Sequence, residues 1–327
     1  MIRVAINGYG RIGRIAHRVI LEKHANEIDV VAINASSSTD VKGWSYLLKY
    51  DTSYGPLQNH EISSDNENLI IDGKEIPVIS QRDPSQLPWK DLNVDVVIES
   101  TGRFTDEEGL KAHLTAGAAA VVLSAPTKSE SIPTYVVSVN SKDYKGEDII
   151  SNASCTTNSI TPVAKVMIDH FGVEKAMMTT IHGYTSDQRL QDGGHKDYRR
   201  ARAAALNIIP TTTGATIAAS KAIPALAGIF QGLAIRVPVA VGSLSDFTFV
   251  LKKETSKNEI NEVFKKEAEN PVYKGILQVT EDPLVSSDII GNPHSAIVDL
   301  SLTQVVGGNL AKVIAWYDNE YGYANRL

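Results

Sequence analysis

The strongest constraint on the fold is a glycine-rich hexapeptide that joins a short apolar strand to a helical pattern. Residues 3–7 are mostly apolar and β-favouring, and residues 8–13 follow them as G-x-G-x-x-G. Apolar residues then recur at helical spacing up to Ile20. In this context Gly8 permits a tight turn, Gly10 lets the backbone approach a pyrophosphate, and Gly13 lets helix and strand pack closely. The pattern predicts a dinucleotide-binding unit, with a purely structural turn as the alternative.

Strand and helix patterns alternate through the first half of the chain. Short apolar runs predict strands over residues 28–33, 94–98, 119–123 and 134–139. A helical pattern covers residues 42–48. Alternation of this kind is typical of a doubly wound parallel sheet. We therefore expect an α/β protein whose first domain is of the Rossmann type.

The pattern changes near Ser154. A helix is predicted over residues 156–170, and β-favouring runs follow over residues 176–181, 233–239, 245–251 and 295–300. These runs alternate more strongly, which favours a mixed or antiparallel sheet covered by helices on one side. Residues 185–202 are rich in Asp, Gly, His and Arg and predict an ordered functional loop. We expect a dinucleotide-binding domain over residues 1–154 and an α+β catalytic domain from Cys155 onward.

Composition narrows the classes of function. The 327 residues carry a formal net charge of -6, so we expect neither a nucleic acid nor an anionic membrane as the main partner. No apolar run approaches the roughly 18 residues of a membrane-spanning helix, and the first strand begins too early for a signal peptide. A cytoplasmic protein is therefore expected. The single cysteine excludes an internal disulfide and a Cys-rich zinc site, and we expect no metal.

The only cysteine, Cys155, lies where a thiol would be reactive. It is flanked by small polar residues, follows a strand-like run over residues 148–150 and precedes the helix predicted over residues 156–170. The backbone dipole at a helix N-terminus favours the thiolate, which is the nucleophile. The alternative is a buried structural cysteine, although such cysteines usually have apolar neighbours.

A thiol nucleophile needs a base or a cation nearby. His182 ends a strand-like run and opens a loop, and a strand end beside a helix N-terminus is a plausible meeting point. His195 lies in a charged loop and is expected to be solvated or to order that loop.

Several residues could bind a phosphate group on a substrate. Arg236 lies in an apolar run, where a lone arginine is costly to bury without an anion. Thr185 follows His182 closely, and residues 211–214 form a hydroxyl-rich turn. Each has an ordinary alternative: a salt-bridged arginine, or threonines in a helix cap. The arginines of residues 199–202 have the alternative of a charged loop face.

The end of the second strand bears on cofactor choice. A carboxylate is expected about 20 residues after the glycine motif, where it would accept the ribose 2′-OH. Residues 34–38 read Asn-Ala-Ser-Ser-Ser instead. The missing negative charge and the three hydroxyls favour acceptance of a 2′-phosphate, and therefore of NADP. The alternative is a serine-rich turn with NAD held through the backbone.

Taken together, these segments closely resemble the phosphorylating glyceraldehyde-3-phosphate dehydrogenases. The resemblance follows the order of that family from residue 1 to the last residues, and the octapeptide around Cys155 is highly specific. The matching stretches are residues 6–14, 47–51, 99–102, 124–126, 151–158, 182–189, 199–205, 210–214 and 316–322.

The resemblance implies a reaction. Cys155 would attack the aldehyde of D-glyceraldehyde 3-phosphate to form a hemithioacetal. His182 would assist thiol ionisation and then remove a proton as hydride leaves for NAD or NADP. Inorganic phosphate would cleave the resulting thioester to 1,3-bisphosphoglycerate, and the reaction would be reversible, in glycolysis or gluconeogenesis.

The resemblance also assigns binding residues. Positions that match the family's substrate and phosphate contacts are Ser154, Thr156, Thr185, Thr213, Gly214 and Arg236. Positions that match its cofactor contacts are Arg11, Ile12, Arg82, Ser124 and Asn319, in addition to Gly8, Gly10 and Gly13. Asn319 would hold the nicotinamide amide.

The family is a homotetramer, which implies the same assembly here. Residues 185–202 would form an S-shaped loop near the subunit interface and the cofactor. Residues 316–327 would return to the first domain, so that the catalytic domain covers residues 155–315. The sequence ends at Leu327, before the C-terminal helix that family members normally carry.

Departures from the family concern cofactor choice and the thiol. Ala35 replaces the usual ribose-binding aspartate, and Gly193-Gly194 replace a Leu-Pro pair. Members that accept NADP tend to vary at both places, so the two departures agree. Ser159 replaces a frequent second cysteine, which removes a disulfide partner for Cys155.

Two alternative functions stay open. An erythrose-4-phosphate dehydrogenase would share the fold and the thiol chemistry, and residues 294–299 and 325–326 look somewhat like that enzyme. A non-catalytic binding or scaffolding protein on the same fold is the second alternative. The intact Cys155 and His182 argue against it as the main role.

Overall fold

The computed structural model describes all residues, 1–327, and divides into two compact units. The first unit comprises Met1–Tyr135, Tyr144–Ala153 and Leu327. The second comprises Val136–Asp143 and Ser154–Arg326. None of the helices has both the length and the hydropathy that crossing a membrane requires.

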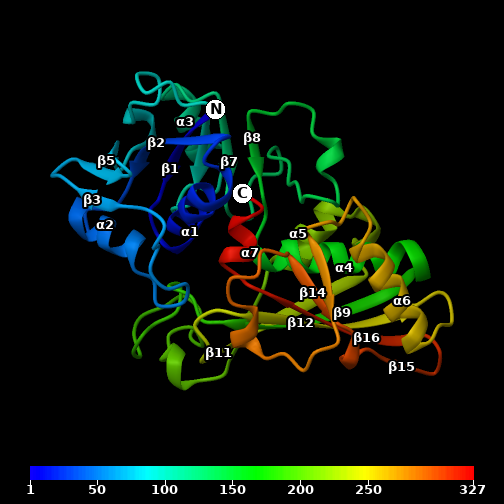
Figure 1. The fold of residues 1–327 in the computed structure, drawn as a ribbon. Helices are drawn as coiled ribbons and strands as arrows, with labels where there is room; N and C mark the ends of the chain where they lie inside the picture. Colours follow the sequence, from blue (N-terminus) through cyan, green and yellow to red (C-terminus); the bar gives the residue numbers. More distant parts are fainter. The chain divides into compact units, whose positions relative to one another are not determined.

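The first unit contains a sheet in the order β3-β4-β5-β2-β1-β6-β7-β8 (Figure 1). In this order, the six neighbouring strands β5-β2-β1-β6-β7-β8 run parallel. At one edge of the sheet, β3 pairs antiparallel with β4, and β4 pairs antiparallel with β5. The strands are β1 Ile2–Asn7, β2 Ile28–Asn34, β3 Ile62–Ser64, β4 Asn68–Ile71, β5 Lys74–Ile79, β6 Val96–Glu99, β7 Ala120–Leu123 and β8 Ile149–Ser151. The helices are α1 Arg11–Val19, η1 Ile20–His24, α2 Val41–Lys49, η2 Pro84–Gln86 and α3 Glu107–Thr115. The doubly wound parallel sheet is confirmed, with an antiparallel edge that the sequence did not reveal.

Both faces of this sheet are covered. Side chains alternate along a strand, so β1 sends Val4 and Ile6 into the core that contains Leu48 of α2, and Ala5 into the opposite core. The second core also contains Leu110 of α3. The central strands are therefore buried on both sides, which explains their continuous apolar sequence.

The strand predicted over residues 134–139 is wrong. Only Thr134 bridges to the sheet, at Ser151. The following residues form a turn in which the backbone N–H groups of Val139 and Asn140 donate to the Val136 carbonyl oxygen. Ser138 has a φ of 70°, a left-handed conformation that ends an extended run.

The second unit contains a mixed sheet in the order β10-β11-β9-β12-β16-β14-β13, with β15 paired to β16. The strands are β9 Val173–Gly183, β10 Ile209–Thr212, β11 Phe230–Val237, β12 Ser243–Leu251, β13 Leu277–Thr280, β14 Ala296–Asp299, β15 Gln304–Val306 and β16 Leu310–Tyr317. The helices are α4 Cys155–Phe171, α5 Ala215–Ala222, α6 Lys257–Ala268 and α7 Tyr321–Ala324. Short single turns complete the unit: η3 Ser141–Asp143, η4 Ala204–Leu206, η5 Pro224–Leu226, η6 Ser286–Ile289 and η7 Leu300–Leu302. The mixed sheet with helices on one side is confirmed.

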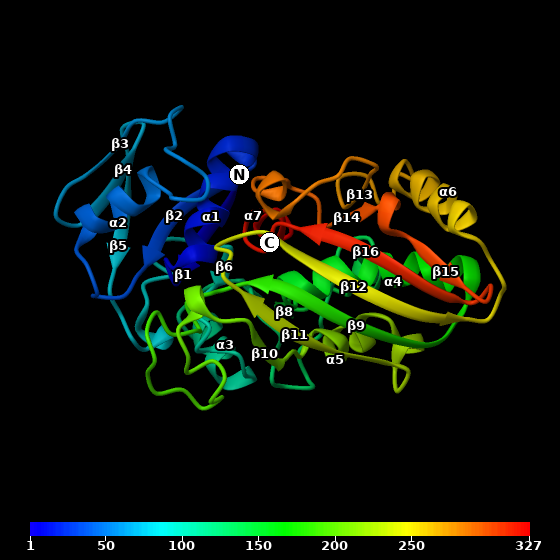
Figure 2. The same ribbon diagram turned by 90° about the horizontal axis from the view of Figure 1, so that it is seen from below.

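Helix α4 packs on this sheet (Figure 2). Its apolar residues, including Val163 and Met167, share one core with Phe247 and Phe249 of β12 and with Val313 of β16. The other face of β9 and β11 carries exposed apolar side chains. One face of the sheet therefore forms the core and holds the N-terminal end of α4 in place.

The C-terminal segment differs from the expected domain boundary. We expected residues 316–327 to return to the first domain, but the structure assigns residues up to Arg326 to the second unit and only Leu327 to the first. Trp316 and Tyr317 end β16, which pairs with β12 and β14. These ladder hydrogen bonds hold the segment in the second sheet.

Candidate active site

The N-terminal end of α4 presents Cys155. Ser154 is the N-cap residue, and its hydroxyl accepts a hydrogen bond from the backbone N–H of Thr157 at 3.1 Å. Just before the cap, the fully buried Ala153 has a φ of 56°, an unusual conformation for a residue with a Cβ. The chain thus turns sharply from β8 into α4, and the turn places a half-buried thiol in the first helical turn.

His182 and Arg236 lie side by side on neighbouring strands. β9 and β11 are parallel, and these two residues pair in register near the strand ends. The Nε2 atom of His182 lies 3.5 Å from the Sγ atom of Cys155. The structure therefore brings together Cys155, His182 and Arg236 from three segments that are far apart in the chain.

Two groups of opposite kind contact Nδ1 of His182. The carbonyl oxygen of Gly183, an acceptor, lies 2.6 Å from it, and Nη1 of Arg236, a donor, lies 2.8 Å from it. Nη1 of Arg236 also donates to the Gly183 carbonyl oxygen at 3.0 Å. In the tautomer with its proton on Nδ1, the lone pair of Nε2 faces the thiol of Cys155, which is the arrangement of a general base.

Burial sets the protonation of the pair. Burial, reinforced by the positive charge of Arg236, lowers the pKa of His182 to about 3. Burial also raises the pKa of Cys155, while the charge of Arg236 and hydrogen bonds at Thr156 oppose this rise. The sequence led us to expect that the helix N-terminus would favour the thiolate, but desolvation outweighs it. At neutral pH the resting pair is therefore a neutral thiol beside a neutral imidazole.

Tyr317 was not among the predicted site residues. Its buried hydroxyl lies 2.9 Å from the Thr156 hydroxyl and 2.8 Å from the Thr180 hydroxyl. Its ring meets that of His182 edge-on, at 6.0 Å between centroids. Tyr317 thereby fixes Thr156, the residue after the thiol. The matching stretch 316–322 was the only sequence signal, and we read it as part of the first domain.

Thr185, Thr213 and Gly214 lie in the same unit as Cys155 and His182 and form no hydrogen bond with either residue. Thr185 follows the end of β9, and its backbone N–H donates to the Gln188 side chain. Thr213 and Gly214 lie between β10 and α5, where Gly214 is the N-cap residue and the Thr213 hydroxyl accepts from Ala215.

Arg200 is a further cation in this unit, for which the sequence left open a phosphate contact or a charged loop face. It donates to the Thr211 hydroxyl at 2.9 Å and pairs with Asp187 and Asp197. Its positive charge also contributes to the low pKa of His182. The loop of residues 185–202 is therefore tied to β10, and it places a second arginine near the histidine.

In the first unit, the three motif glycines have different roles. A Cβ at Gly13 would lie 2.1 Å from the Gly8 carbonyl oxygen, and one at Gly8 would lie 2.5 Å from the Thr101 nitrogen. Gly8 also has a φ of 100°. In contrast, a Cβ at Gly10 would meet nothing within 4 Å. Gly8 and Gly13 are required for packing, whereas Gly10 leaves open space at the start of α1, which has no side-chain cap.

That open space belongs to a cavity of about 380 Å³. It contains the predicted residues Gly8, Gly10 and Arg82, together with Ala35. The other lining residues are Asn7, Tyr9, Asn34, Ser36, Ser37, Trp44, Ser80, Gln81, Ser100, Thr101, Arg103 and Phe104. The lining has two arginines and no carboxylate. The open space at Gly10, the uncapped N-terminus of α1 and the positive charge of the two arginines could all bind the phosphates of a dinucleotide.

The remaining cofactor candidates are placed as follows. Arg11 pairs with the buried Asp51 and lies over the Tyr54 ring at 5.8 Å. Ile12 lies in the first turn of α1, and Ser124 follows β7, where its N–H donates to the Glu99 carbonyl. Asn319 belongs to the second unit, unlike the other cofactor candidates.

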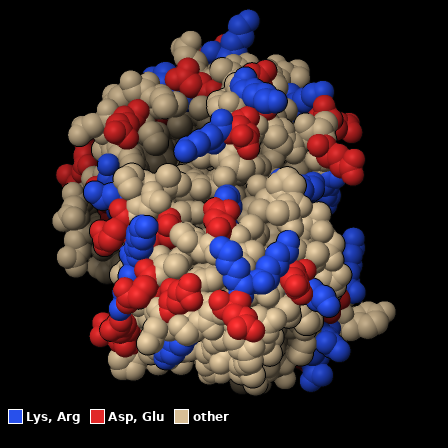
Figure 3. Space-filling model, turned by 90° about the vertical axis from the view of Figure 1, so that its right-hand side faces the viewer, with Lys and Arg blue, Asp and Glu red and all other residues tan.

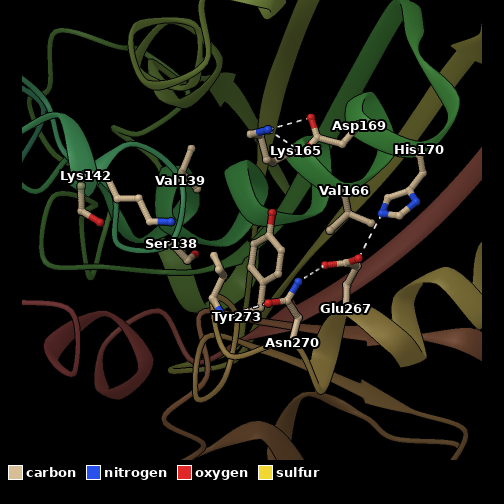
Figure 4. Close-up of a pocket in the computed structure, with 12 residues that line it drawn as sticks. Ser138, Val139, Lys142, Lys165, Val166, Asp169, His170, Glu267, Asn270 and Tyr273 are labelled. Atoms are coloured by element: carbon tan, nitrogen blue, oxygen red, sulfur yellow. Dashed lines mark hydrogen bonds and ion pairs between the residues drawn. The ribbon is translucent and has the colours of Figure 1, made fainter.

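A separate cavity of about 390 Å³ lies in the second unit (Figure 4). Its polar groups are largely paired with each other: Lys165 with Asp169, and His170 with Glu267 at 3.1 Å. None of the predicted site residues lines it. On the face in Figure 3, charges of both signs alternate, without a continuous basic patch.

Comparisons with known proteins match most of the chain to one family. The profile of the glyceraldehyde 3-phosphate dehydrogenase NAD binding domain matches residues 2–107, and that of the C-terminal domain of the same family matches residues 154–319. A glyceraldehyde-3-phosphate dehydrogenase of Streptomyces coelicolor is 50% identical over the whole chain and 96% of its own length. The chloroplastic form A of Chlamydomonas reinhardtii is also 50% identical, over the whole chain and 87% of its own length. The chloroplastic form B of Pisum sativum is 49% identical, over the whole chain and 72% of its own length.

Proposed function

This chain belongs to the glyceraldehyde-3-phosphate dehydrogenase family, and we propose that Cys155 and His182 carry out its reaction. In that reaction D-glyceraldehyde 3-phosphate is oxidised and phosphorylated to 1,3-bisphosphoglycerate. The observation that carries the assignment of the two residues is the 3.5 Å approach of His182 Nε2 to Cys155 Sγ. NAD or NADP, when bound, accepts the hydride.

The neutral pair suggests how the thiol is activated. As Sγ of Cys155 attacks the aldehyde carbon, Nε2 of His182 takes the thiol proton. The protonated His182 then donates to the oxygen of the tetrahedral adduct, and as neutral imidazole it later removes that proton when the carbonyl of the thioester forms. Inorganic phosphate attacks the thioester and releases the Cys155 thiolate. Both proton removals need an unprotonated Nε2, as in the tautomer of His182 that carries its proton on Nδ1 beside the Gly183 carbonyl.

Cations and hydroxyls around the thiol support binding of phosphate groups. The partly buried Arg236 has no carboxylate partner, and burial lowers the pKa of its guanidinium. A substrate phosphate would pair with it. We assign further phosphate contacts to Ser154, Thr156, Thr185, Thr213 and Gly214.

In the first unit, Gly8, Gly10, Gly13, Arg11, Ile12, Arg82 and Ser124 would hold the cofactor, and Asn319 would hold its nicotinamide amide. No carboxylate lines the cavity, and Ala35 and the serines after it place no negative charge near a 2′-phosphate. This lining favours acceptance of NADP. We expect Ala35→Asp to lower kcat/KM for NADP far more than for NAD. Equal loss for both cofactors would contradict this assignment.

We also propose a homotetramer. Large apolar side chains are exposed on the outer face of the second sheet and in the loops beside it: Met177 is 69% exposed, Leu190 85%, Tyr198 87% and Leu206 83%. Exposed apolar side chains in such number are typical of subunit interfaces. Sedimentation of the purified protein would test the assembly.

A cytoplasmic location fits the need to keep the single thiol reduced. There the reversible reaction would serve glycolysis or gluconeogenesis. Fractionation of cells would test the location.

The proposal is tested by following cofactor reduction at 340 nm with glyceraldehyde 3-phosphate. We expect turnover that requires inorganic phosphate or arsenate and that is lost in Cys155→Ser. Turnover only with erythrose 4-phosphate would favour the alternative enzyme, although the relatives named above give it no support. No turnover with either substrate would favour a binding protein.

A further inference from the structure

The side chain of Asn319 is held from one side only. Its Oδ1 atom accepts a hydrogen bond of 3.1 Å from the backbone N–H of Gly242 and one of 3.0 Å from the hydroxyl of Ser243. The residue is only 3% exposed, and these two bonds to Oδ1 are the hydrogen bonds of its side chain, so Nδ2 makes none within the chain. Two donors facing one end of an amide identify that end as the oxygen. The NH2 group therefore points away from Gly242 and Ser243.

Ser243 has its own orientation fixed as well. It is the first residue of β12 and is 1% exposed. Its Oγ atom accepts a hydrogen bond of 3.2 Å from the backbone N–H of Gly183. Since Oδ1 of Asn319 can only accept, the hydroxyl proton of Ser243 is directed toward Asn319. One hydroxyl thus links Asn319 to Gly183, the residue whose carbonyl oxygen lies 2.6 Å from Nδ1 of His182.

We propose that Ser243 is a positioning residue for the cofactor: it holds the Asn319 amide so that Nδ2 is presented as a donor to the carboxamide oxygen of the nicotinamide. This inference rests on the proposed function, in which Asn319 holds the nicotinamide amide. Ser243 itself touches neither substrate nor cofactor.

Loss of the hydroxyl has a specific consequence. In Ser243→Ala, only the Gly242 N–H still faces the Asn319 oxygen, so the amide is held less firmly and its donor is presented less often. We expect binding of NAD or NADP to weaken about tenfold, the effect of one lost hydrogen bond of ordinary strength. A ligand without nicotinamide does not use Asn319, and its affinity should not change.

The same strand offers a matched control. Ser245 lies two residues along β12, on the same face, is fully buried, and its hydroxyl has no hydrogen-bond partner. Ser245→Ala therefore removes a hydroxyl from the same environment without removing a link to Asn319. Ser243→Thr keeps the hydroxyl and should restore binding to within about twofold of the wild type.

The experiment is calorimetric titration of the full chain and these variants with NAD and NADP, and with ADP-ribose and 2′-phospho-ADP-ribose. We expect Ser243→Ala to weaken binding of the two cofactors and to leave binding of the two nicotinamide-free ligands unchanged. Equal weakening of all four ligands would overturn the inference in favour of a structural role, and unchanged cofactor binding would also overturn it. Should Ser243→Ala fail to fold, Asn319→Asp, which keeps the acceptor but lacks the donor, must show the same selective loss.

The controls separate this inference from the proposed function. A wild-type chain that binds neither cofactor would overturn both. Wild-type binding and turnover, together with cofactor binding that Ser243→Ala leaves intact, would overturn only the role of Ser243.

Discussion

Arg236 is the residue on which the chemistry of the reactive pair depends most. It lies beside His182 on the adjacent strand, donates to the Gly183 carbonyl, and its charge opposes the effect of burial on the pKa of Cys155. It also helps to keep the pKa of His182 at about 3. The charge of Arg236 therefore favours the thiolate of Cys155 and keeps His182 unprotonated. Both effects make Cys155 a better nucleophile.

This leads to a prediction about thiol reactivity. In Arg236→Met the opposing charge is gone, so the pKa of Cys155 should rise further. The pH at which alkylation of Cys155 by iodoacetamide reaches half its maximal rate should therefore move upward, and alkylation at pH 7 should slow. Arg199→Met, which removes an exposed charge from the loop, is the control. An unmoved midpoint in Arg236→Met would show that its charge does not reach the thiol.

Some residues of the site could be predicted from the sequence and others could not. Cys155 and His182 stand in local patterns, a helix start and a strand end, that indicate chemistry by themselves. The partner of Thr156, Tyr317, lies 161 residues further along the chain. No local pattern reports such a contact, because it arises only when β16 joins the sheet.

Helix α4 is the element that carries the thiol, and its N-cap links stability to function. Ser154 caps α4 through the Thr157 N–H, and Ser256 caps α6 in the same way through the Glu259 N–H. Each Ser→Ala change should lower the free energy of unfolding by about 1 kcal/mol. Only Ser154→Ala should also lower kcat, because only α4 begins at the reactive thiol. Urea unfolding and steady-state kinetics would measure this, and an equal loss of kcat in both variants would contradict it.

The turn from β1 into α1 gives a second prediction at this scale. Gly10→Ala should leave stability nearly unchanged, because its Cβ would enter open space, but it should weaken cofactor binding by filling the cradle. Gly13→Ala should destabilise the fold by several kcal/mol, because its Cβ would lie 2.1 Å from a backbone oxygen. Thermal unfolding and cofactor titration would separate the two. Tight cofactor binding by Gly10→Ala would show that the open space is not the cofactor site.

The elements themselves differed in how well the sequence predicted them. Buried parallel strands such as β1 and β2 have continuous apolar runs, and they were found within a residue or two at either end. β16 was missed as a strand. The antiparallel strands β3, β4 and β5 were missed because they are short and many of their residues are polar. The run over residues 134–139 has the composition of a strand but lacks a neighbour to pair with, and β propensity without a partner does not make a strand.

At the scale of the whole chain, the unit boundary was hard to predict because no linker marks it. Residues Val136–Asp143 leave the first unit and return to it at Tyr144, although nothing in their composition changes. Val139 packs against the core of the second unit. Contacts between distant segments, rather than composition, therefore decide which unit a segment joins.

The last prediction concerns acid stability and rests on two buried histidines with a lowered pKa, one in each unit. Burial lowers the pKa of His17 in the first unit and of His182 in the second to about 3. An unfolded histidine binds a proton below about pH 6.5. Between about pH 6.5 and 3 the unfolded chain therefore binds more protons than the folded chain, so the free energy of unfolding falls as pH falls. Each histidine contributes a slope of up to about 1.4 kcal/mol per pH unit.

His17→Gln tests this directly, because it removes one titrating group from the first unit. The variant should be less stable at pH 7, where it loses the contact of His17 with the Tyr9 hydroxyl at 2.7 Å, but its stability should fall less steeply between pH 6.5 and 4.5. Urea unfolding at a series of pH values measures the slope, and the exposed His24→Gln is the matched control. A slope that His17→Gln leaves as steep as in the wild type would mean that His17 takes up its proton in the folded chain, and that its burial does not limit the acid stability of the first unit.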